Sequence, residues 1–121
     1  MHKTYKIVLD GTEIETSRLE KADAPMGVVW GEIAFQEIPS PYRLFKDHFV
    51  KHGIAINADD PEHGFLDTQT ISGLQVFRQD EREIKGIAGN SITGMEEEGY
   101  EISIMGIAYP FFAEEFPHHV G

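Results

Sequence analysis

Residues 40–53 have the sequence SPYRLFKDHFVKHG, and this stretch carries the signals of a helix at both of its ends. Ser40 is a favourable N-cap residue, and Pro41 suits the first helical position because it has no N–H to leave unpaired. Gly53 suits the left-handed conformation that often follows the last turn of a helix. The stretch therefore predicts one well-delimited helix, and the rest of the fold is arranged around it.

One side of the predicted helix is apolar, whereas the opposite side is charged. Spacings of three and four residues place four side chains on one face of the helix: Tyr42, Phe45, Phe49 and His52. The other side carries an i, i+4 ladder of Arg43, Asp47 and Lys51. This division predicts that the aromatic stripe packs the helix against a sheet while the charged ladder faces solvent.

The remaining sequence has the alternating pattern of short β-strands separated by turns. Strand-like runs lie at residues 5–9, 13–15, 27–38, 54–56, 67–77, 83–88 and 100–107. We expect residues 67–88 to form a hairpin, residues 57–64 an exposed loop, residues 17–22 a helical turn or loop, and residues 112–116 one helical turn.

Short turns between strands favour antiparallel pairing, and glycines inside strands are places where a sheet can bend. Such glycines are Gly31, Gly73 and Gly106. We therefore expect residues 1–121 to form a single α+β domain. In it, an antiparallel, strongly bent sheet, with a partly open barrel as one form of it, carries one principal helix at about 40–53.

Composition excludes several classes of protein. The chain has 121 residues, of which 40% are hydrophobic, and it contains no cysteine. A folded domain is expected, without disulfides or a thiolate zinc site. The N-terminus lacks the pattern of a signal peptide, and no apolar run is long enough to span a membrane, so we expect a cytoplasmic protein.

The charge is strongly negative and unevenly distributed. Ten Lys and Arg residues stand against 21 Asp and Glu residues, which gives a net charge of −11. Residues 61–121 contain three basic and eleven acidic residues, a net charge of −8. A field of this sign repels nucleic acids and anionic membranes, and it accelerates encounter with a basic protein. Solubility alone is the alternative explanation of such a charge.

Acidic and aromatic residues are interleaved near the C-terminus, in the way that is typical of protein-binding surfaces. The candidate partner-binding residues are Glu96, Glu97, Glu98, Tyr100, Glu101, Tyr109, Phe111, Glu114 and Glu115. The alternative interpretation is a solvated turn and a solvated helix end.

His48 and His52 have the i, i+4 spacing that places two imidazoles on one helix face, as a divalent metal requires. A metalloprotease motif would need Glu at position 49, which is Phe49 here. Candidates for a third ligand are Asp59, Asp60, Glu62, His63, His118 and His119. The alternative is a pair of half-buried histidines with local hydrogen bonds.

No catalytic residue is predicted, because the chain has no phosphate-binding glycine loop, no nucleophile elbow and no redox pair. A divalent metal at the two histidines is the one cofactor under consideration. A binding site for a small ligand inside the bent sheet, lined by Trp30 and Phe35, is a further hypothesis.

Three short segments resemble a loose set of small uncharacterised bacterial proteins. They are Ala22-Asp23-Ala24-Pro25-Met26-Gly27-Val28, Ser40-Pro41-Tyr42 and Phe116-Pro117-His118-His119-Val120. The overall profile, a small acidic domain with neither cysteine nor catalytic motif, is also similar to bacterial immunity proteins. That resemblance implies a non-enzymatic protein that masks a basic partner, such as a toxin, and it assigns no residues.

Overall fold

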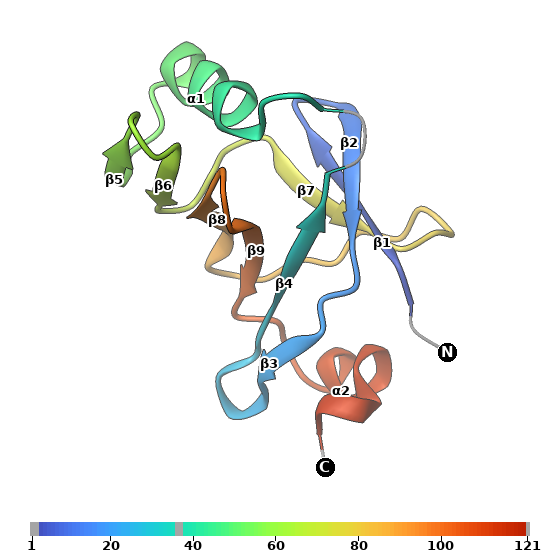
Figure 1. Ribbon diagram of the computed structural model, residues 1–121. Helices are drawn as coiled ribbons and strands as arrows, with labels where there is room; N and C mark the ends of the chain where they lie inside the picture. The colour runs from blue at the N-terminus through green and yellow to red at the C-terminus, as the bar shows by residue number, and fades with distance from the viewer. Residues whose placement is uncertain (1–2, 36–37, 121) are drawn as a thin grey trace.

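The computed structural model describes residues 3–35 and 38–120 of the chain. Within these residues, nine strands, two α-helices and two short 3-10 helices follow one another in this order (Figure 1): β1 Tyr5–Leu9, β2 Thr12–Ser17, β3 Lys21–Asp23, η1 Ala24–Met26, β4 Val28–Ala34, α1 Pro41–His52, β5 Ile56–Asp60, β6 Phe65–Thr68, β7 Leu74–Phe77, β8 Gly89–Met95, β9 Gly99–Met105, α2 Phe111–Glu115 and η2 Pro117–His119.

The strands form one antiparallel sheet in the order β5-β6-β8-β9-β4-β2-β1-β7. Strand β4 is shared, because its first residues pair with β3 and its last residues pair with β2. Within the described residues β5 and β7 end the sheet without pairing to each other, so the sheet is not closed into a barrel. The α+β class and the antiparallel pairing are therefore confirmed.

The helix α1 has the ends that the sequence predicts. The Ser40 hydroxyl accepts a hydrogen bond from the backbone N–H of Arg43 at 3.3 Å, and Pro41 is the first helical residue. Gly53 adopts a left-handed conformation with φ 63° and donates its N–H to the carbonyl of Phe49. Both signals are local, and both are confirmed.

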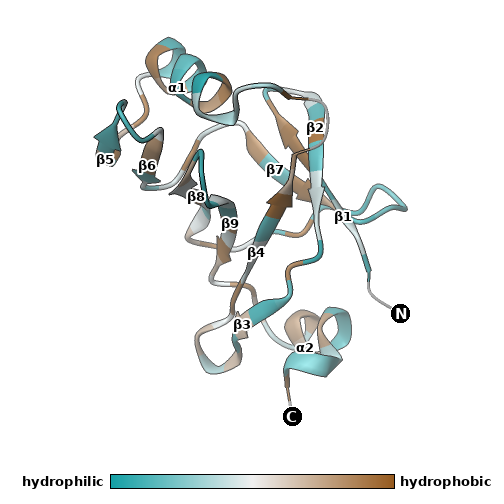
Figure 2. Cartoon of the chain, in the orientation of Figure 1, coloured by the Kyte–Doolittle hydropathy of each residue, from teal (hydrophilic) through white to brown (hydrophobic). Residues whose placement is uncertain are grey.

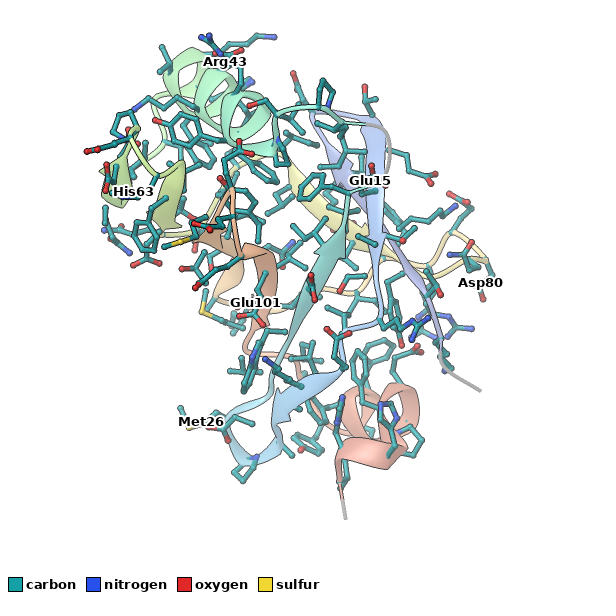
Figure 3. All side chains as sticks on the ribbon, viewed as in Figure 1. Glu15, Met26, Arg43, His63, Asp80 and Glu101 are labelled. Atoms are coloured by element: carbon teal, nitrogen blue, oxygen red, sulfur yellow. The ribbon has the colours of Figure 1, made fainter. Side chains whose placement is uncertain are left out.

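The buried face of α1 shares Phe45 and Phe49 with the predicted stripe but differs from it at its edges. Phe45, His48 and Phe49 are buried, while His52 is exposed and Tyr42 is half-buried. The ring of Phe45 lies 5.9 Å from that of Tyr100 on β9, and this contact fastens the helix to the sheet. Figure 3 shows Arg43 on the outer side of α1, pointing away from the body.

The second helix lies at the other end of the molecule (Figure 1). Phe112 and Phe116 are fully buried, and the Phe116 ring lies 5.8 Å from that of Tyr5 on β1. Figure 2 shows hydrophobic residues along β1, β4 and β7, whereas the turns and β5 are mostly hydrophilic.

The predicted hairpin at residues 67–88 is wrong. Residues 65–68 form β6, which pairs with β5 and β8, whereas residues 74–77 form β7, which pairs with β1. Between them lies a turn at Ser72 and Gly73, and Gly73 has φ 86°, a conformation that favours glycine. The predicted returning strand at 83–88 is reduced to a single bridge between Phe77 and Glu83.

Three segments predicted without strands contain them, and one of these, residues 89–95, forms β8. Residues 57–60 belong to β5, so the predicted loop is confined to the turn after Asp60, and residues 21–23 form β3 rather than a helical turn or loop. Backbone pairing with a neighbouring strand overrides the low β-propensity of these polar residues. The predicted strand at 27–38 ends at Ala34, and residues 36 and 37 lie outside the described residues.

Gly31 confirms the close backbone approach expected of a glycine inside a strand. A Cβ atom at this position would lie 2.7 Å from the backbone of Leu19. The connection from β2 to β3 therefore runs along β4 here at a distance that only glycine permits, and it brings the Glu20 carboxylate to the backbone of Glu32.

Candidate functional site

The outer face of β4 and β9 places two glutamates directly opposite each other. Glu32 on β4 and Glu101 on β9 are register partners, and both project from the side of the sheet opposite the buried Gly31 and Ile102. Like charges at directly opposed positions of an antiparallel pair destabilise the sheet. Glu101 is labelled over β9 in Figure 3.

A third carboxylate, that of Glu20, joins this pair from the connection between β2 and β3. The backbone N–H of Glu32 donates to the Glu20 side chain at 2.7 Å. One nearby cation is Lys21, whose Nζ lies 3.1 Å from a carboxylate oxygen of Glu101, and Arg18 lines the same hollow. Three carboxylates and two cations leave a small local excess of negative charge.

The turn between β8 and β9 extends the negative surface. Glu97 and Glu98 are exposed at its tip. Glu96 has a structural role as well, because its carboxylate accepts hydrogen bonds from the Ser40 hydroxyl at 3.2 Å and from the Tyr42 backbone N–H at 3.0 Å. A carboxylate at the N-terminus of α1 is favoured by the helix dipole.

Glu32 connects the carboxylates on β4 and β9 with the glutamates of the turn between β8 and β9, because it lines two neighbouring hollows. One hollow is bordered by Glu32 and the turn glutamates, and it also contains Phe35, Ile38 and Pro41. The other is bordered by Glu32, Glu20, Glu101, Arg18 and Lys21. We name this surface the acidic face and define it by Glu20, Glu32, Glu96, Glu97, Glu98 and Glu101. Its charge and partly apolar lining suit cationic side chains with aliphatic stems.

A further hollow beside α1 has mixed charge. Its lining includes Arg43 and Lys46 together with Glu62, His63 and Glu96. Because both cations and anions line it, the sign of the charge does not point to a ligand for this hollow.

The structure divides the nine predicted partner-binding residues between the two ends of the molecule. Glu96, Glu97, Glu98 and Glu101 lie on the acidic face, whereas Tyr109, Phe111 and Glu114 lie near α2 (Figure 1). Tyr109 is exposed and donates its hydroxyl to the Ala24 carbonyl at 2.7 Å. Phe111 is half-buried beneath the Arg82 guanidinium, 4.6 Å from its ring centre.

The other two predicted residues, Tyr100 and Glu115, are buried. The Tyr100 hydroxyl donates to the Gly64 carbonyl, and burial together with the nearby Glu96 charge raises the pKa of Tyr100 above its usual range. Glu115 accepts hydrogen bonds from Tyr5, Lys3 and Arg78. These two side chains hold the fold together and present no surface to a partner.

His48 and His52 lie together on α1, with ring centres 4.4 Å apart. The residue beside them is Asp10, which the sequence does not suggest, and its carboxylate oxygen lies 3.6 Å from His52 Nε2. Of the predicted third ligands, Asp59 is bonded to Lys46 and Tyr42 on another side of α1. Asp60, Glu62 and His63 form a separate exposed cluster, and His119 contacts Leu19 near η2.

The two aromatics predicted to line a ligand site have different surroundings. Trp30 lies half-buried on the outer face of β4, next to Glu32 in the alternation of the strand. Phe35 follows the end of β4, with its ring 6.0 Å from Phe45 and 6.2 Å from Tyr100, and it also lines the hollow that Glu32 borders.

Asp59 supplies a test of how α1 is attached to β5. The hydrogen bond from the Lys46 ammonium group lowers the pKa of Asp59, and the hydroxyl of Tyr42 donates to the same carboxylate at 2.7 Å. Desolvation together with this carboxylate raises the pKa of Tyr42 to about 12. The charged carboxylate thus joins two positions of the helix to an edge strand.

We predict that Asp59→Asn lowers the free energy of unfolding by about 1–2 kcal/mol at pH 7. A lowered folded-state pKa contributes stability that is complete above the unfolded pKa of about 3.9 and is lost as pH falls through the folded value. The difference between wild type and variant should therefore shrink as pH falls below 4. Urea unfolding at pH 7, 5 and 3 measures it, and an equal difference at all three values would contradict the assignment.

Comparisons with known proteins give no assignment. No protein-family model matches the chain, and neither a curated protein nor a solved structure matches it. Within residues 3–35 and 38–120, no helix is long and apolar enough to cross a membrane.

Proposed function

We propose that this chain is a non-enzymatic binding protein that masks a basic protein partner, and that the acidic face is its binding surface. The observation that carries the proposal is the opposition of Glu32 and Glu101 across β4 and β9. Lys21 offsets part of the repulsion by its contact with Glu101, and a further cation from a partner, placed between the two carboxylates, would add attraction.

The residues around the pair also support the binding of a basic partner at this face. Glu20, Glu97 and Glu98 add charge of the same sign, while Phe35, Ile38 and Pro41 provide apolar surface in the adjoining hollow. Half-buried Trp30 stands beside Glu32 on the outer face of β4. Acidic groups around apolar and aromatic surface fit Lys and Arg side chains, which carry both an aliphatic stem and a charge.

The partner class follows from the charge and from the resemblance in profile to immunity proteins. A basic protein, such as a nuclease toxin, would meet a surface complementary in sign, and the net charge of −11 would accelerate the encounter. Affinity should then fall with increasing salt, because the attraction between exposed charges is screened.

Affinity capture from an extract of the source cells tests the proposal. The wild-type chain is compared with a Glu32→Gln, Glu101→Gln double variant. A second double variant, Glu13→Gln with Asp47→Asn, is the control with the same net charge. Glu13 on β2 and Asp47 on the outer side of α1 are both exposed. We expect the wild type and the control to retain the same basic protein at low salt, and the Glu32→Gln, Glu101→Gln variant to lose it.

Two results would count against the proposal. The first is that the wild type retains no basic protein at low ionic strength. The second is that the Glu32→Gln, Glu101→Gln variant retains the partner as well as the control does. The two variants have the same net charge, so equal binding would place the contact elsewhere on the surface.

The cross-strand pair also predicts a gain in stability. Glu32→Gln removes the repulsion and should raise the free energy of unfolding by about 0.5 kcal/mol, a small gain because both groups reach solvent. The gain should disappear in about 1 M salt, because the Debye length is then only about 3 Å and the repulsion between the two carboxylates is screened. Urea unfolding of this variant beside Glu13→Gln measures the effect, and a loss of stability would show that Glu32 has a stabilising contact instead.

A further inference from the structure

We propose that Asp10, His48 and His52 form a binding site for a divalent transition-metal ion, with Zn²⁺ as the best match. One ring nitrogen of each histidine and one oxygen of Asp10 all lie within 4.8 Å of one another. The histidines come from successive turns of α1, and Asp10 comes from the turn between β1 and β2. This site is separate from the acidic face and does not depend on the proposed function.

The buried member of the group, His48, has one ring nitrogen held by the protein, which leaves the other for a metal. Its Nε2 lies 2.8 Å from the carbonyl oxygen of Ser72. Because a carbonyl oxygen only accepts hydrogen bonds, Nε2 must carry the hydrogen, and Nδ1 of the neutral ring keeps its lone pair. Histidine ligands of metals typically donate their other N–H to a carbonyl or carboxylate, which holds the ring in position.

The turn at Ser72 and Gly73, which contacts His48, also positions Asp10. Its backbone N–H donates to the Gly73 carbonyl at 2.9 Å, so residues 72 and 73 hold both the imidazole of His48 and the backbone of Asp10. A side chain at position 73 would place its Cβ 3.3 Å from the His48 ring. Glycine at this position therefore leaves room for the ring and for the turn, which has φ 86°.

Metal binding would draw the three ligand atoms closer together than the 4.8 Å within which they now lie. Ligands of one tetrahedral Zn²⁺ at about 2.0–2.1 Å lie roughly 3.3 Å apart. His52 Nε2 and Asp10 Oδ2 are 3.6 Å apart, and both side chains are partly exposed and free to close the remaining gap. Lys51 Nζ, 3.5 Å from the same oxygen and largely exposed, would have to swing away.

The donor set indicates which metals fit. Two imidazoles and one carboxylate suit zinc and other late first-row ions, whereas Ca²⁺ and Mg²⁺ prefer oxygen ligands alone. Three protein ligands leave a tetrahedral ion with one position for water or another ligand.

A second cluster provides an internal comparison. Asp60, Glu62 and His63 also lie within 4.8 Å of one another, but all three are exposed and the group has a single imidazole. Its His63 Nδ1 is 2.8 Å from Asp60 Oδ2, a contact that a metal ion bound at these two atoms would have to replace. We therefore expect Zn²⁺ to prefer the site on α1.

Titration calorimetry of the full chain with zinc chloride tests the site, with the shift of the unfolding temperature by Zn²⁺ as a second readout. We expect His52→Ala and Asp10→Asn to weaken binding by at least about tenfold and to abolish the temperature shift. Both residues are exposed, so these variants should keep the wild-type circular dichroism spectrum. Lys51→Met, which removes the competing cation, should bind Zn²⁺ more tightly than the wild type.

His63→Ala is the matched control, and it should bind Zn²⁺ as the wild type does. The proposal would be overturned if the wild type bound no Zn²⁺ in calorimetry. It would equally be overturned if His52→Ala bound as tightly as the wild type while His63→Ala lost binding, because that result places the ion at the exposed cluster.

Discussion

Phe45→Ala is expected to lower the free energy of unfolding by about 3–5 kcal/mol, the range for removing a buried aromatic side chain. Phe45 is fully buried. Its ring packs on Phe49 within α1, on Phe35 after β4 and on Tyr100 of β9. The substitution would leave a cavity where the helix meets the sheet, and a domain of this size has only about 5–15 kcal/mol of stability in total.

Urea unfolding followed by circular dichroism measures this loss. The control is Val50→Ala on the same helix, because Val50 is 71% exposed and its truncation should change stability by about 0.5 kcal/mol or less. If Phe45→Ala does not fold, Phe45→Leu should fold with a smaller loss. Equal effects of the alanine substitutions at positions 45 and 50 would contradict the packing of α1 on the sheet.

Glu115→Ala is expected to cost about 2–3 kcal/mol, the second-largest effect. Glu115 is 2% exposed, and its carboxylate accepts hydrogen bonds from the Tyr5 hydroxyl at 2.7 Å and from Arg78 at 3.2 Å. Removing the carboxylate leaves the buried hydroxyl without its acceptor. The cost stays below that of a fully buried ion pair because the Arg78 side chain is 32% exposed and can be hydrated.

Glu114→Ala is a control of the same residue type at the neighbouring position. Glu114 is exposed on α2, so its removal should change the unfolding free energy by about 0.5 kcal/mol or less. Thermal and urea unfolding of the two variants compare the positions directly. A loss at position 114 equal to that at position 115 would refute the structural role that we assign to the buried carboxylate.

The helix α1 was predictable from sequence because its signals are local. Ser40, Pro41 and Gly53 lie at the two ends of the helix, and the aromatic spacing lies between them. The hairpin prediction at 67–88 failed because β6 pairs with β5, the strand just before it, and with β8, whereas β7 pairs with the remote β1. Strand β7 pairs with β1, and no pattern within the hairpin region indicates that partner.

The candidate site shows the same division between local and remote information. The acidic turn at 96–98 was visible as a run of glutamates, but the opposition of Glu32 to Glu101 depends on the register of two strands far apart in the chain. Asp10 joins the histidines of α1 in the same way, through a turn that no spacing rule connects to residues 48 and 52.

The burial of Tyr100 and Glu115 did have a sequence signal. Tyr100 alternates with Ile102 and Ile104, and this apolar face of β9 is the one that turns inward. Glu115 follows Phe112 by three residues and precedes Phe116, so helical spacing places it on the buried side of α2. Residues that share an apolar face are better assigned to the core than to a partner surface.

The location of the acidic face is tested most directly by nuclear magnetic resonance, with a decalysine peptide as a defined basic probe added to the labelled chain at low salt. We predict that the largest amide shifts fall at residues 30–32, 97–98 and 101, that they weaken in the Glu32→Gln, Glu101→Gln variant, and that high salt removes them. Shifts spread evenly over the surface, or gathered at residues 57–64 or 111–120, would contradict the assignment of partner binding to the acidic face.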